Sequence, residues 1–143
     1  MVRLFAVVIA LSLWAAPAAL AGMVDLRLGP NGHFEAIAEI NGRSIAVLVD
    51  TGASAVTLSH EDARFAGLSP NTLDYDVPVA TANGSVMAAR VKIRRISIDG
   101  VRVDDVEGFV LPEGALKGSL LGMSFLSRLS SYRVEDGVMR LRE

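Results

Sequence analysis

After residue 22, apolar and polar residues alternate in short runs, and many of these runs are separated by Asn-Gly or Asp-Gly pairs. Alternation is typical of strands that bury one face, and such pairs favour the type I′ turns of two-residue hairpins. The pairs are Asn31-Gly32, Asn41-Gly42, Asn83-Gly84, Asp99-Gly100 and Asp136-Gly137. The pattern predicts an all-β chain with strands near residues 24–29, 33–40, 43–50, 55–58, 76–82, 85–93, 96–98, 101–106, 109–111, 131–135 and 138–142.

Two segments depart from this alternation and predict short helices. Ser59 is a suitable N-cap, acidic residues follow it in the first turn, and Gly67 supplies a stop. Between residues 119 and 129, Leu121, Phe125 and Leu129 recur at helical spacing. We therefore expect one helix after Ser59 and a second beginning around Gly122 or slightly earlier.

The apolar positions change parity at Arg94-Arg95. Val91 and Ile93 precede this pair at odd positions, and Ile96 and Ile98 follow it at even positions. One extra residue in the strand, a β-bulge, is the simplest cause of such a change. The two arginines suit a solvated outer face better than a substrate contact.

Residues 1–21 have the layout of a secretory signal peptide. Arg3 precedes an apolar stretch, Pro17 interrupts it, and Ala19-Leu20-Ala21 forms a small-x-small cleavage site. The stretch from Leu4 to Val24 is also long enough for an uncleaved membrane anchor. We expect cleavage after Ala21 and a single domain at 22–143, periplasmic or secreted, or else tethered to the inner membrane and facing the periplasm.

Composition narrows the chemistry of the 143-residue chain to hydroxyls and carboxylates. The chain has no cysteine, which excludes a thiol nucleophile, a thiolate-bound metal and a disulfide framework. Two distant histidines, His33 and His60, leave little for a metal site, and both are expected at the surface. The 16 acidic residues exceed the 14 Lys and Arg, which argues against a nucleic-acid partner. No metal or cofactor is expected.

The most informative segment is residues 44–58. An unbroken apolar run, Ile45–Val49, predicts a strand buried on both faces, and Asp50-Thr51-Gly52 follows it directly. A carboxylate at the end of a buried strand is costly unless its oxygens accept hydrogen bonds. Gly52 and Ala53 are small enough for backbone N–H groups to approach it. Taken alone, the tripeptide is better explained by a structural Asx-turn between two strands.

Other features favour a functional role for Asp50. A long hairpin, Val77–Val91, is tipped by Ala82-Asn83-Gly84-Ser85 and suits a mobile cover for a cleft. Near the C-terminus, Leu120-Leu121-Gly122 combines two bulky apolar residues with a glycine that permits close backbone approach.

With VDTGAS at 49–54, TANG at 81–84 and SLLGMSFL at 119–126 in this order, the chain resembles the retropepsin-like aspartic proteases, in particular bacterial single-domain members that are secreted or membrane-anchored. The resemblance extends over roughly residues 24–142. It implies a small closed β-barrel with one or two short helices, and an active site formed between two copies.

The resemblance also implies roles for individual residues. Asp50 corresponds to the catalytic acid and base, Thr51 to the threonine whose hydroxyl reaches the partner loop, and Gly52 to the loop glycine. Ala53 follows the retroviral pattern, and Gly122 corresponds to the glycine that supports the catalytic loop. The flap that covers substrate corresponds to Ala82, Asn83 and Gly84.

The chain departs from the family pattern at two places. Met123 and Ser124 follow Gly122, where retroviral enzymes have an arginine that pairs with charges at the base of the dimer. Apolar contacts must replace that ionic network. The flap also lacks the tyrosine of pepsins.

Metal-free hydrolysis of a peptide needs both a base for water and an acid for the substrate. The chain has one Asp-Thr-Gly, so a second Asp50 must come from another molecule, and a homodimer that cleaves protein or peptide substrates is predicted. The strands around Asp136-Gly137 and the start of the mature chain are the candidate interface. Two alternatives are a non-catalytic dimer that binds an extended peptide under the flap and, less well supported, a monomeric lipocalin-like carrier.

Overall fold

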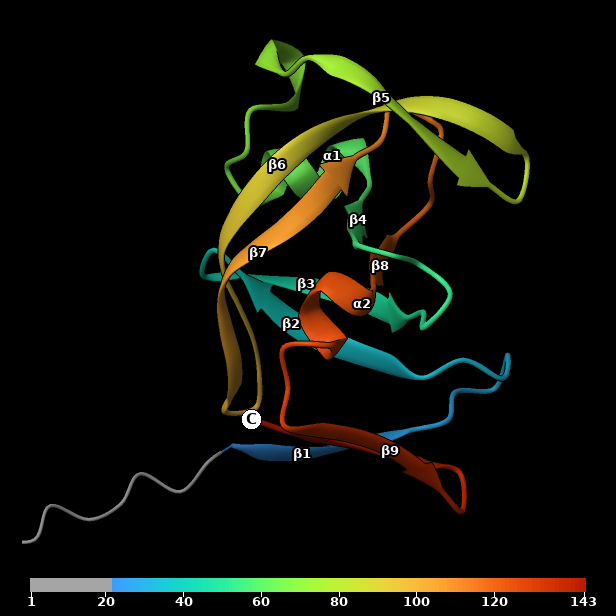
Figure 1. Ribbon diagram of the computed structural model, residues 1–143, viewed down its shortest axis with the longest axis vertical. Coiled ribbons are helices and arrows are strands. Elements are labelled where there is room, and N and C mark those ends of the chain that lie inside the picture. Colours follow the sequence, from blue (N-terminus) through green and yellow to red (C-terminus); the bar gives the residue numbers. More distant parts are fainter. Residues whose placement is uncertain (1–21) are drawn as a thin grey trace, which may run out of the picture.

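The computed structural model describes residues 22–143, and its centre is a closed barrel of six strands (Figure 1). In barrel order, the strands are β2 (Glu35–Ile40), β3 (Arg43–Val49), β8 (Ser119–Leu121), β4 (Val56–Leu58), β7 (Val101–Val110) and β6 (Gly84–Ile98). The barrel closes because β2 also pairs with β6. The predicted all-β fold of retropepsin-like type is therefore confirmed.

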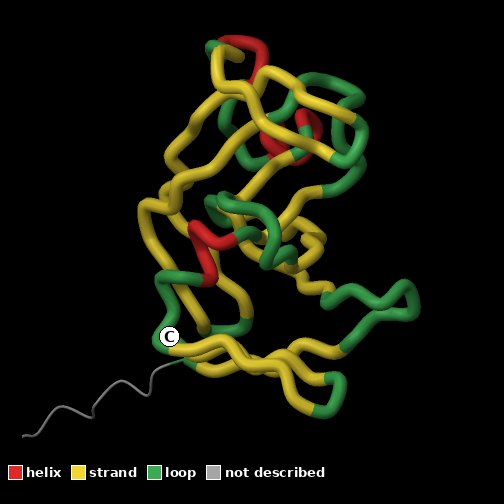
Figure 2. The backbone as a smooth tube through the Cα atoms, turned by 45° about the vertical axis from the view of Figure 1, so that its right-hand side comes forward, coloured by secondary structure: helices red, strands yellow, loops and turns green. Residues whose placement is uncertain are grey.

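A separate three-stranded sheet joins the two ends of the described chain and lies below the barrel (Figures 1 and 2). We call it the terminal sheet. It consists of β1 (Met23–Arg27), β10 (Val138–Arg142) and β9 (Ser131–Glu135), in that order. β10 is the central strand, so β1 and β9 both present an unpaired edge.

A long hairpin extends from the top of the barrel (Figure 1). It is formed by β5 (Tyr75–Thr81) and the first part of β6, which pair from Tyr75 with Ala89 to Thr81 with Gly84. β5 pairs only with β6 and lies outside the closed ring. The hairpin is thus attached to the barrel through β6 alone and projects beyond it.

The barrel interior is filled by side chains. Leu58, Ile93, Leu121, Phe125 and Leu126 are all fully buried in a single apolar cluster. Large branched and aromatic side chains therefore occupy the space that a lipocalin-like carrier would keep for its ligand. The barrel accordingly provides a scaffold, and any binding site lies outside its core.

The helices are short: α1 (His60–Phe65), the 3₁₀-helix η1 (Pro70–Thr72) and α2 (Met123–Leu126). Ser59 caps α1 as predicted, because its hydroxyl accepts a hydrogen bond from the Asp62 N–H at 3.1 Å. The prediction of a surface His60 is wrong, since this residue is buried and its Nε2 bonds Asn71 Oδ1 at 3.1 Å.

The second helix is shorter than its apolar spacing suggested. Residues 119–121 form β8, which lies between β3 and β4 and pairs with both. The pairing of β8 with two strands overrides the local helical pattern, and α2 begins only after Gly122.

The predicted I′ turns form at three of the five sites. At Asn41-Gly42, Asp99-Gly100 and Asp136-Gly137 both residues have positive φ. At Asn31-Gly32 and Asn83-Gly84 only the glycine does.

The predicted β-bulge at Arg94-Arg95 is wrong. β6 and β7 are each continuous through the region and keep one register, with Ile93 opposite Val106 and Arg95 opposite Asp104. Both strands change parity at the same level, and Asp105 takes positive φ there. The boundaries that were predicted between 93 and 96 and between 106 and 109 therefore do not exist.

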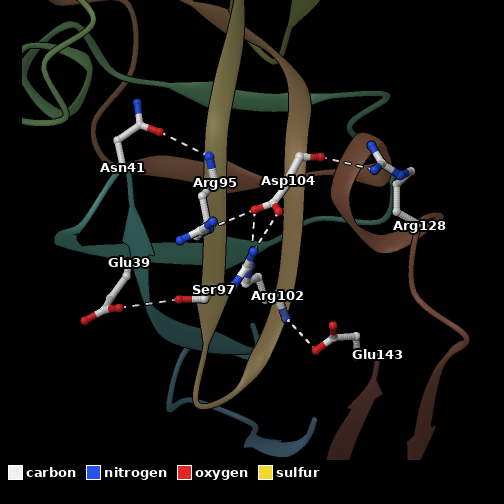
Figure 3. Close-up of polar contacts among 8 residues, drawn as sticks. All are labelled: Glu39, Asn41, Arg95, Ser97, Arg102, Asp104, Arg128 and Glu143. Atoms are coloured by element: carbon white, nitrogen blue, oxygen red, sulfur yellow. Dashed lines mark hydrogen bonds and ion pairs between the residues drawn. The ribbon is translucent and has the colours of Figure 1, made fainter. Parts of the chain in front are cut away.

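A network of charges covers this point on the outside of the barrel (Figure 3). The Asp104 carboxylate accepts hydrogen bonds from Arg95 Nε at 2.8 Å and from Arg102 Nη2 at 2.9 Å. These two guanidinium groups hold the pKa of Asp104 far below its usual value. Arg128 donates to the Asp104 carbonyl at 3.1 Å, so the segment that follows α2 is linked to the same point. The contacts are those of a structural outer face.

The leader expected at residues 1–21, with its cleavage site or anchor, lies outside the described residues. Within 22–143, no helix combines the length and apolar character needed to cross a bilayer.

Candidate active site

Asp50 lies where the strand β3 leaves the barrel. The prediction that this strand is buried on both faces is wrong, because Ile45, Val47 and Val49 are buried but Ala46, on the other face, is exposed. β3 runs parallel to β8, and the Asp50 N–H donates to the Leu121 carbonyl at 3.1 Å. The Asp50 carboxylate is partly exposed, and its Oδ1 accepts a hydrogen bond from the Gly52 N–H at 2.9 Å. The sequence therefore places one oriented carboxylate at an opening of the barrel.

The Asp50 loop (residues 50–55) is held from below by the segment that joins β8 to α2. The Ala53 carbonyl accepts from the Met123 N–H at 2.8 Å, and the Ala53 N–H donates to the Asp50 carbonyl at 3.2 Å. A Cβ at Gly122 would lie 2.3 Å from the Ala55 carbonyl oxygen. Only glycine allows the two backbones to approach this closely.

Ser124 makes a second attachment beneath the loop. Its hydroxyl accepts from the Val56 N–H at 2.8 Å and donates to the Glu107 carbonyl at 2.6 Å. One side chain of α2 thus connects β4, which follows the Asp50 loop, to β7. The sequence shows Ser124 only as a departure from the retroviral arginine pattern, and this does not reveal that it supports the Asp50 loop.

A cleft of about 670 Å³ lies between the Asp50 loop and the overhanging β5–β6 hairpin. The larger apolar side chains of its walls are Val77, Pro78, Val79, Phe109, Leu111, Leu116 and Leu120. Asp50 is the one titratable side chain among the described residues that line this cleft. The cleft therefore combines a single carboxylate with an apolar, extended surface.

The predicted site residues occupy different parts of this arrangement. Asp50, Gly52, Ala53 and Ala82 line the cleft, and Gly122 lies beneath the loop.

Asn83 and Gly84 form the tip of the hairpin, beyond the cleft wall. The Thr81 hydroxyl closes this tip, because it donates to the Gly84 carbonyl at 2.6 Å and accepts from the Asn83 N–H at 3.3 Å. Thr51 is exposed, and within residues 22–143 its hydroxyl has no hydrogen-bond partner.

The sequence pattern identifies the carboxylate but does not reveal most of the cleft wall. Phe109, Leu111, Leu116 and Leu120 come from segments that are brought together only when β7 and β8 join the barrel. The alternation in 101–111 indicates a strand but does not reveal which side chains face a cleft. Within the described part of the chain, no group of three potential metal ligands occurs.

The Asp50 loop, the tip of the β5–β6 hairpin and the β9–β10 hairpin lie on the same side of the molecule, at the right in Figure 1. The lone carboxylate, its cover and the free edge of the terminal sheet are thus accessible from one direction.

Comparison with known proteins agrees with this architecture. Residues 36–128 match the family model described as "gag-polyprotein putative aspartyl protease". The chain is 45% identical over 113 residues to an "Uncharacterized protein in cobV 5'region" from Sinorhizobium sp., covering 79% of this chain and 48% of that protein. It is 36% identical over 120 residues to "Uncharacterized protein RP867" from Rickettsia prowazekii (strain Madrid E), covering 84% and 51%. The chain thus spans about half the length of these two relatives.

Two solved structures have the same fold. The crystal structure of a retropepsin-like aspartic protease from Rickettsia conorii superposes with a TM-score of 0.77 at 34% identity, covering 85% of this chain and 91% of that one. The EIAV protease complexed with the inhibitor HBY-793 superposes with a TM-score of 0.55 at 20% identity, covering 71% and 91%. At that identity the second match establishes the fold alone.

Proposed function

Since the chain belongs to the gag-polyprotein aspartyl protease family and has the retropepsin-like fold, we propose that it is an aspartic endopeptidase whose active site forms between two copies. The observation that carries this proposal is the cleft below the β5–β6 hairpin, where Asp50 is the one titratable side chain among the described lining residues. A single carboxylate there supplies half of the required chemistry.

In the proposed mechanism, the Asp50 carboxyls of the two copies lie close enough to share one proton. Two like charges at that separation cannot both ionise, so the pair contains one base and one acid. The ionised carboxylate takes a proton from the attacking water while the protonated one donates to the substrate carbonyl oxygen, so that a gem-diol forms. When the gem-diol collapses, the first carboxyl gives its proton to the amine nitrogen, the second takes one from a gem-diol hydroxyl, and the C–N bond breaks, which restores the original pair. No covalent intermediate is needed.

The remaining loop residues orient this pair. The Gly52 N–H already bonds Asp50 Oδ1 within one copy. The exposed Thr51 hydroxyl is free to bond the loop of the partner subunit across the two-fold axis. Gly122 and Ser124 hold the loop from below through the contacts described above. The β5–β6 hairpin covers an extended peptide, and Ala82, Asn83 and Gly84 form its moving tip.

The terminal sheet is the proposed dimer interface, because β9 exposes apolar residues on its inner face. Tyr132 and Val134 pair with Leu141 and Met139, which are buried, yet they are themselves 40% and 54% exposed. β9 is also an edge strand with unpaired backbone groups. An edge that is both apolar and unpaired favours pairing with a second strand.

A two-fold axis at Val134 gives the register that charge favours. Antiparallel pairing of two β9 strands would then place Arg133 of each copy opposite Glu135 of the partner subunit, on the polar face of the sheet. An axis at Arg133 would instead bring two arginines together. We expect the Val134 register and a continuous six-stranded sheet, with a total interface of about 1,600 Å².

We further propose an extracytoplasmic location, on the basis of the leader sequence alone. The apolar stretch within residues 1–21 supports export, and retention of this stretch would tether the enzyme to the membrane.

The decisive experiment incubates residues 22–143 with a denatured protein mixture between pH 4 and pH 6, beside Asp50→Asn. We expect cleavage by the wild type, inhibition by a statine-type transition-state mimic, and no cleavage by the variant. Activity should also fall on dilution in parallel with the dimer fraction measured by sedimentation. A dimer that binds the mimic but cleaves nothing would favour the non-catalytic peptide-binding alternative, and cleavage by a strict monomer would eliminate the proposed mechanism.

A further inference from the structure

A second pocket lies at the opposite end of β3 from Asp50. It has a volume of about 450 Å³ and is formed by the β2–β3 turn, the end of α1 and the outer face of β6. Its charged side chains are Arg43, Arg64, Lys92 and Arg94. We call it the basic pocket. All four side chains are exposed, and no carboxylate lines the pocket.

The absence of acidic partners separates these four cations from four of the eight other arginines among residues 22–143. Arg90, Arg95, Arg102 and Arg140 each form an ion pair with a carboxylate. Within residues 22–143, none of the basic-pocket cations does so. The chain as a whole has a net charge of −2, so the gathering does not follow from composition.

The backbone around the pocket is fixed by Asn41. Its N–H donates to the Arg95 carbonyl at 3.0 Å, and its Oδ1 accepts from the Arg95 N–H at 3.2 Å. Its Nδ2 donates to the Ala66 carbonyl at 3.5 Å. One side chain thus connects the β2–β3 turn, β6 and the end of α1. The cations therefore project from a rigid frame rather than from separate mobile loops.

Phe65 gives one wall of the pocket an apolar surface. Its ring is 55% exposed, and the Arg43 guanidinium lies over it at 5.6 Å from the centroid. This contact restricts where Arg43 points. A ligand in the pocket would meet cationic groups together with an exposed aromatic edge.

We propose that the basic pocket binds a phosphate group. Four like charges at one place repel one another, and an anion relieves that repulsion. Guanidinium groups match the geometry of phosphate oxygens in paired hydrogen bonds, and lysine adds a compact charge. The pocket volume accommodates a phosphate with part of the molecule that carries it, for which Phe65 provides the contact. The phosphate is either free in solution or part of a lipid headgroup.

This site is independent of the proposed cleavage chemistry. Arg43 begins β3, whereas Asp50 follows the other end of the same strand, so the two openings lie on opposite sides of the barrel. A bound phosphate would therefore leave the cleft free.

The test is a titration of residues 22–143 with inorganic phosphate, followed by backbone and guanidinium NMR signals, against sodium chloride of equal ionic strength. We expect saturable shifts at Arg43, Lys92 and Arg94. The double variant K92Q/R94Q should bind about a hundredfold more weakly, since each of the two lost charge-assisted contacts contributes about one factor of ten. The control R27Q/K117Q changes the same net charge at exposed sites elsewhere and should bind as the wild type does.

A second arm separates the two sources of the phosphate. Vesicles of phosphatidylcholine, alone or mixed with phosphatidylglycerol, are sedimented with each variant. If the wild-type protein sediments with the anionic vesicles and K92Q/R94Q does not, the phosphate belongs to a lipid headgroup. If the protein binds inorganic phosphate but does not sediment with the vesicles, the ligand is soluble. Non-saturable shifts, equal shifts with chloride, equal loss in both double variants, or preference for a poly-glutamate peptide would each overturn the assignment. Thermal unfolding of both variants checks that they remain folded.

Discussion

The Asp50 loop and the terminal sheet are supported in opposite ways. The loop is held by groups within the chain: the Asp50 N–H donates to the Leu121 carbonyl, the Met123 N–H donates to the Ala53 carbonyl, and the backbones approach closely at Gly122. The terminal sheet has complete pairing in its centre, but β9 leaves an edge and two apolar side chains, Tyr132 and Val134, uncovered.

This difference shows which parts of the molecule are complete in one copy of the chain and which parts need a second copy. The loop is structurally complete, yet it offers a single carboxylate for a reaction that needs two. The terminal sheet performs no chemistry, yet its surface is incomplete. In the proposed dimer a second copy supplies what each lacks. Changes to the loop should therefore affect catalysis or folding directly, and changes to β9 should affect association and, only through it, cleavage.

The largest effect is expected at Asp50. Asp50→Asn should lower cleavage by at least about 10⁴-fold, because the pair loses its base and acid together. When wild type and variant are refolded together in equal amounts, about a quarter of the dimers should contain two aspartates, if the subunits assort at random. Initial rates across mixing ratios measure this dependence.

A rate that follows the square of the wild-type fraction indicates that both carboxyls are needed. A rate linear in that fraction would mean that one Asp50 suffices and that the loop is chemically complete on its own. Sedimentation of the Asp50→Asn protein should still give a dimer.

The next largest effect is expected at Gly122. A methyl group in Gly122→Ala would lie 2.3 Å from the Ala55 carbonyl oxygen and 2.8 Å from that of Ala53, and both are backbone atoms that cannot rotate away. We expect the free energy of unfolding to fall by about 3 kcal/mol or more. Denaturant unfolding of the Asp50→Asn background avoids self-cleavage during the measurement.

Ser127→Ala, at an exposed position just after α2, is the matched control and should change stability by less than about 0.5 kcal/mol. A Gly122→Ala protein as stable as this control would show that the loop tolerates movement at its base.

These two sites also show which features the sequence reveals. Asp50 and Gly122 stand out locally, because a carboxylate directly follows an apolar run and a glycine follows two bulky apolar residues. The I′ turn at Asn41-Gly42 is likewise encoded by its own two residues. Such features depend on neighbours in the chain. The turn at Asn41-Gly42 is confirmed, and the roles of Asp50 and Gly122 stay predictions.

Features that depend on distant partners were missed. Residues 119–121 have helical spacing but become β8 because β3 and β4 lie on either side. The parity change at Arg95 is matched by one at Asp104 in the facing strand, which one strand's pattern does not disclose. The basic pocket needs Arg43, Arg64 and Lys92 from three separate segments.

A charge exchange on β9 tests the dimer register. Arg133→Glu should place two pairs of like charges in the interface and raise the dimer dissociation constant by about tenfold or more, and Glu135→Arg should do the same. The double variant R133E/E135R restores opposite charges in the Val134 register and should recover most of the affinity. Sedimentation over a dilution series gives all four values.

Arg27→Glu lies on β1, at the opposite edge of the same sheet, and should leave association unchanged. Single variants without effect, or a double variant that stays monomeric, would place the interface elsewhere. In either case the unfolding free energy of the barrel should be unaltered, since the changed side chains are exposed.

The smallest expected effect is the loss of stability of the terminal sheet at low pH. Arg140 donates two hydrogen bonds to Asp25, at 2.7 and 2.8 Å, and this lowers the pKa of Asp25 below its ordinary value of 3.8. Because the pKa of Asp25 is lower in the folded state than in the unfolded state, the ion pair stabilises the terminal sheet fully at pH values above the unfolded-state pKa. This stabilisation is lost as the pH falls through the folded-state pKa. The sheet should therefore stay intact from pH 6 to pH 4, where the shared proton at Asp50 is proposed to act, and loosen below that range.

Amide hydrogen exchange of β1 and β10 should show this loss in the wild type. In Asp25→Asn, exchange should already be faster at pH 5 and should change less below pH 4. Asp104→Asn, which breaks the corresponding network on the barrel, should leave exchange in the terminal sheet as it is. If acid accelerated exchange in Asp25→Asn as steeply as in the wild type, another carboxyl would control the sheet.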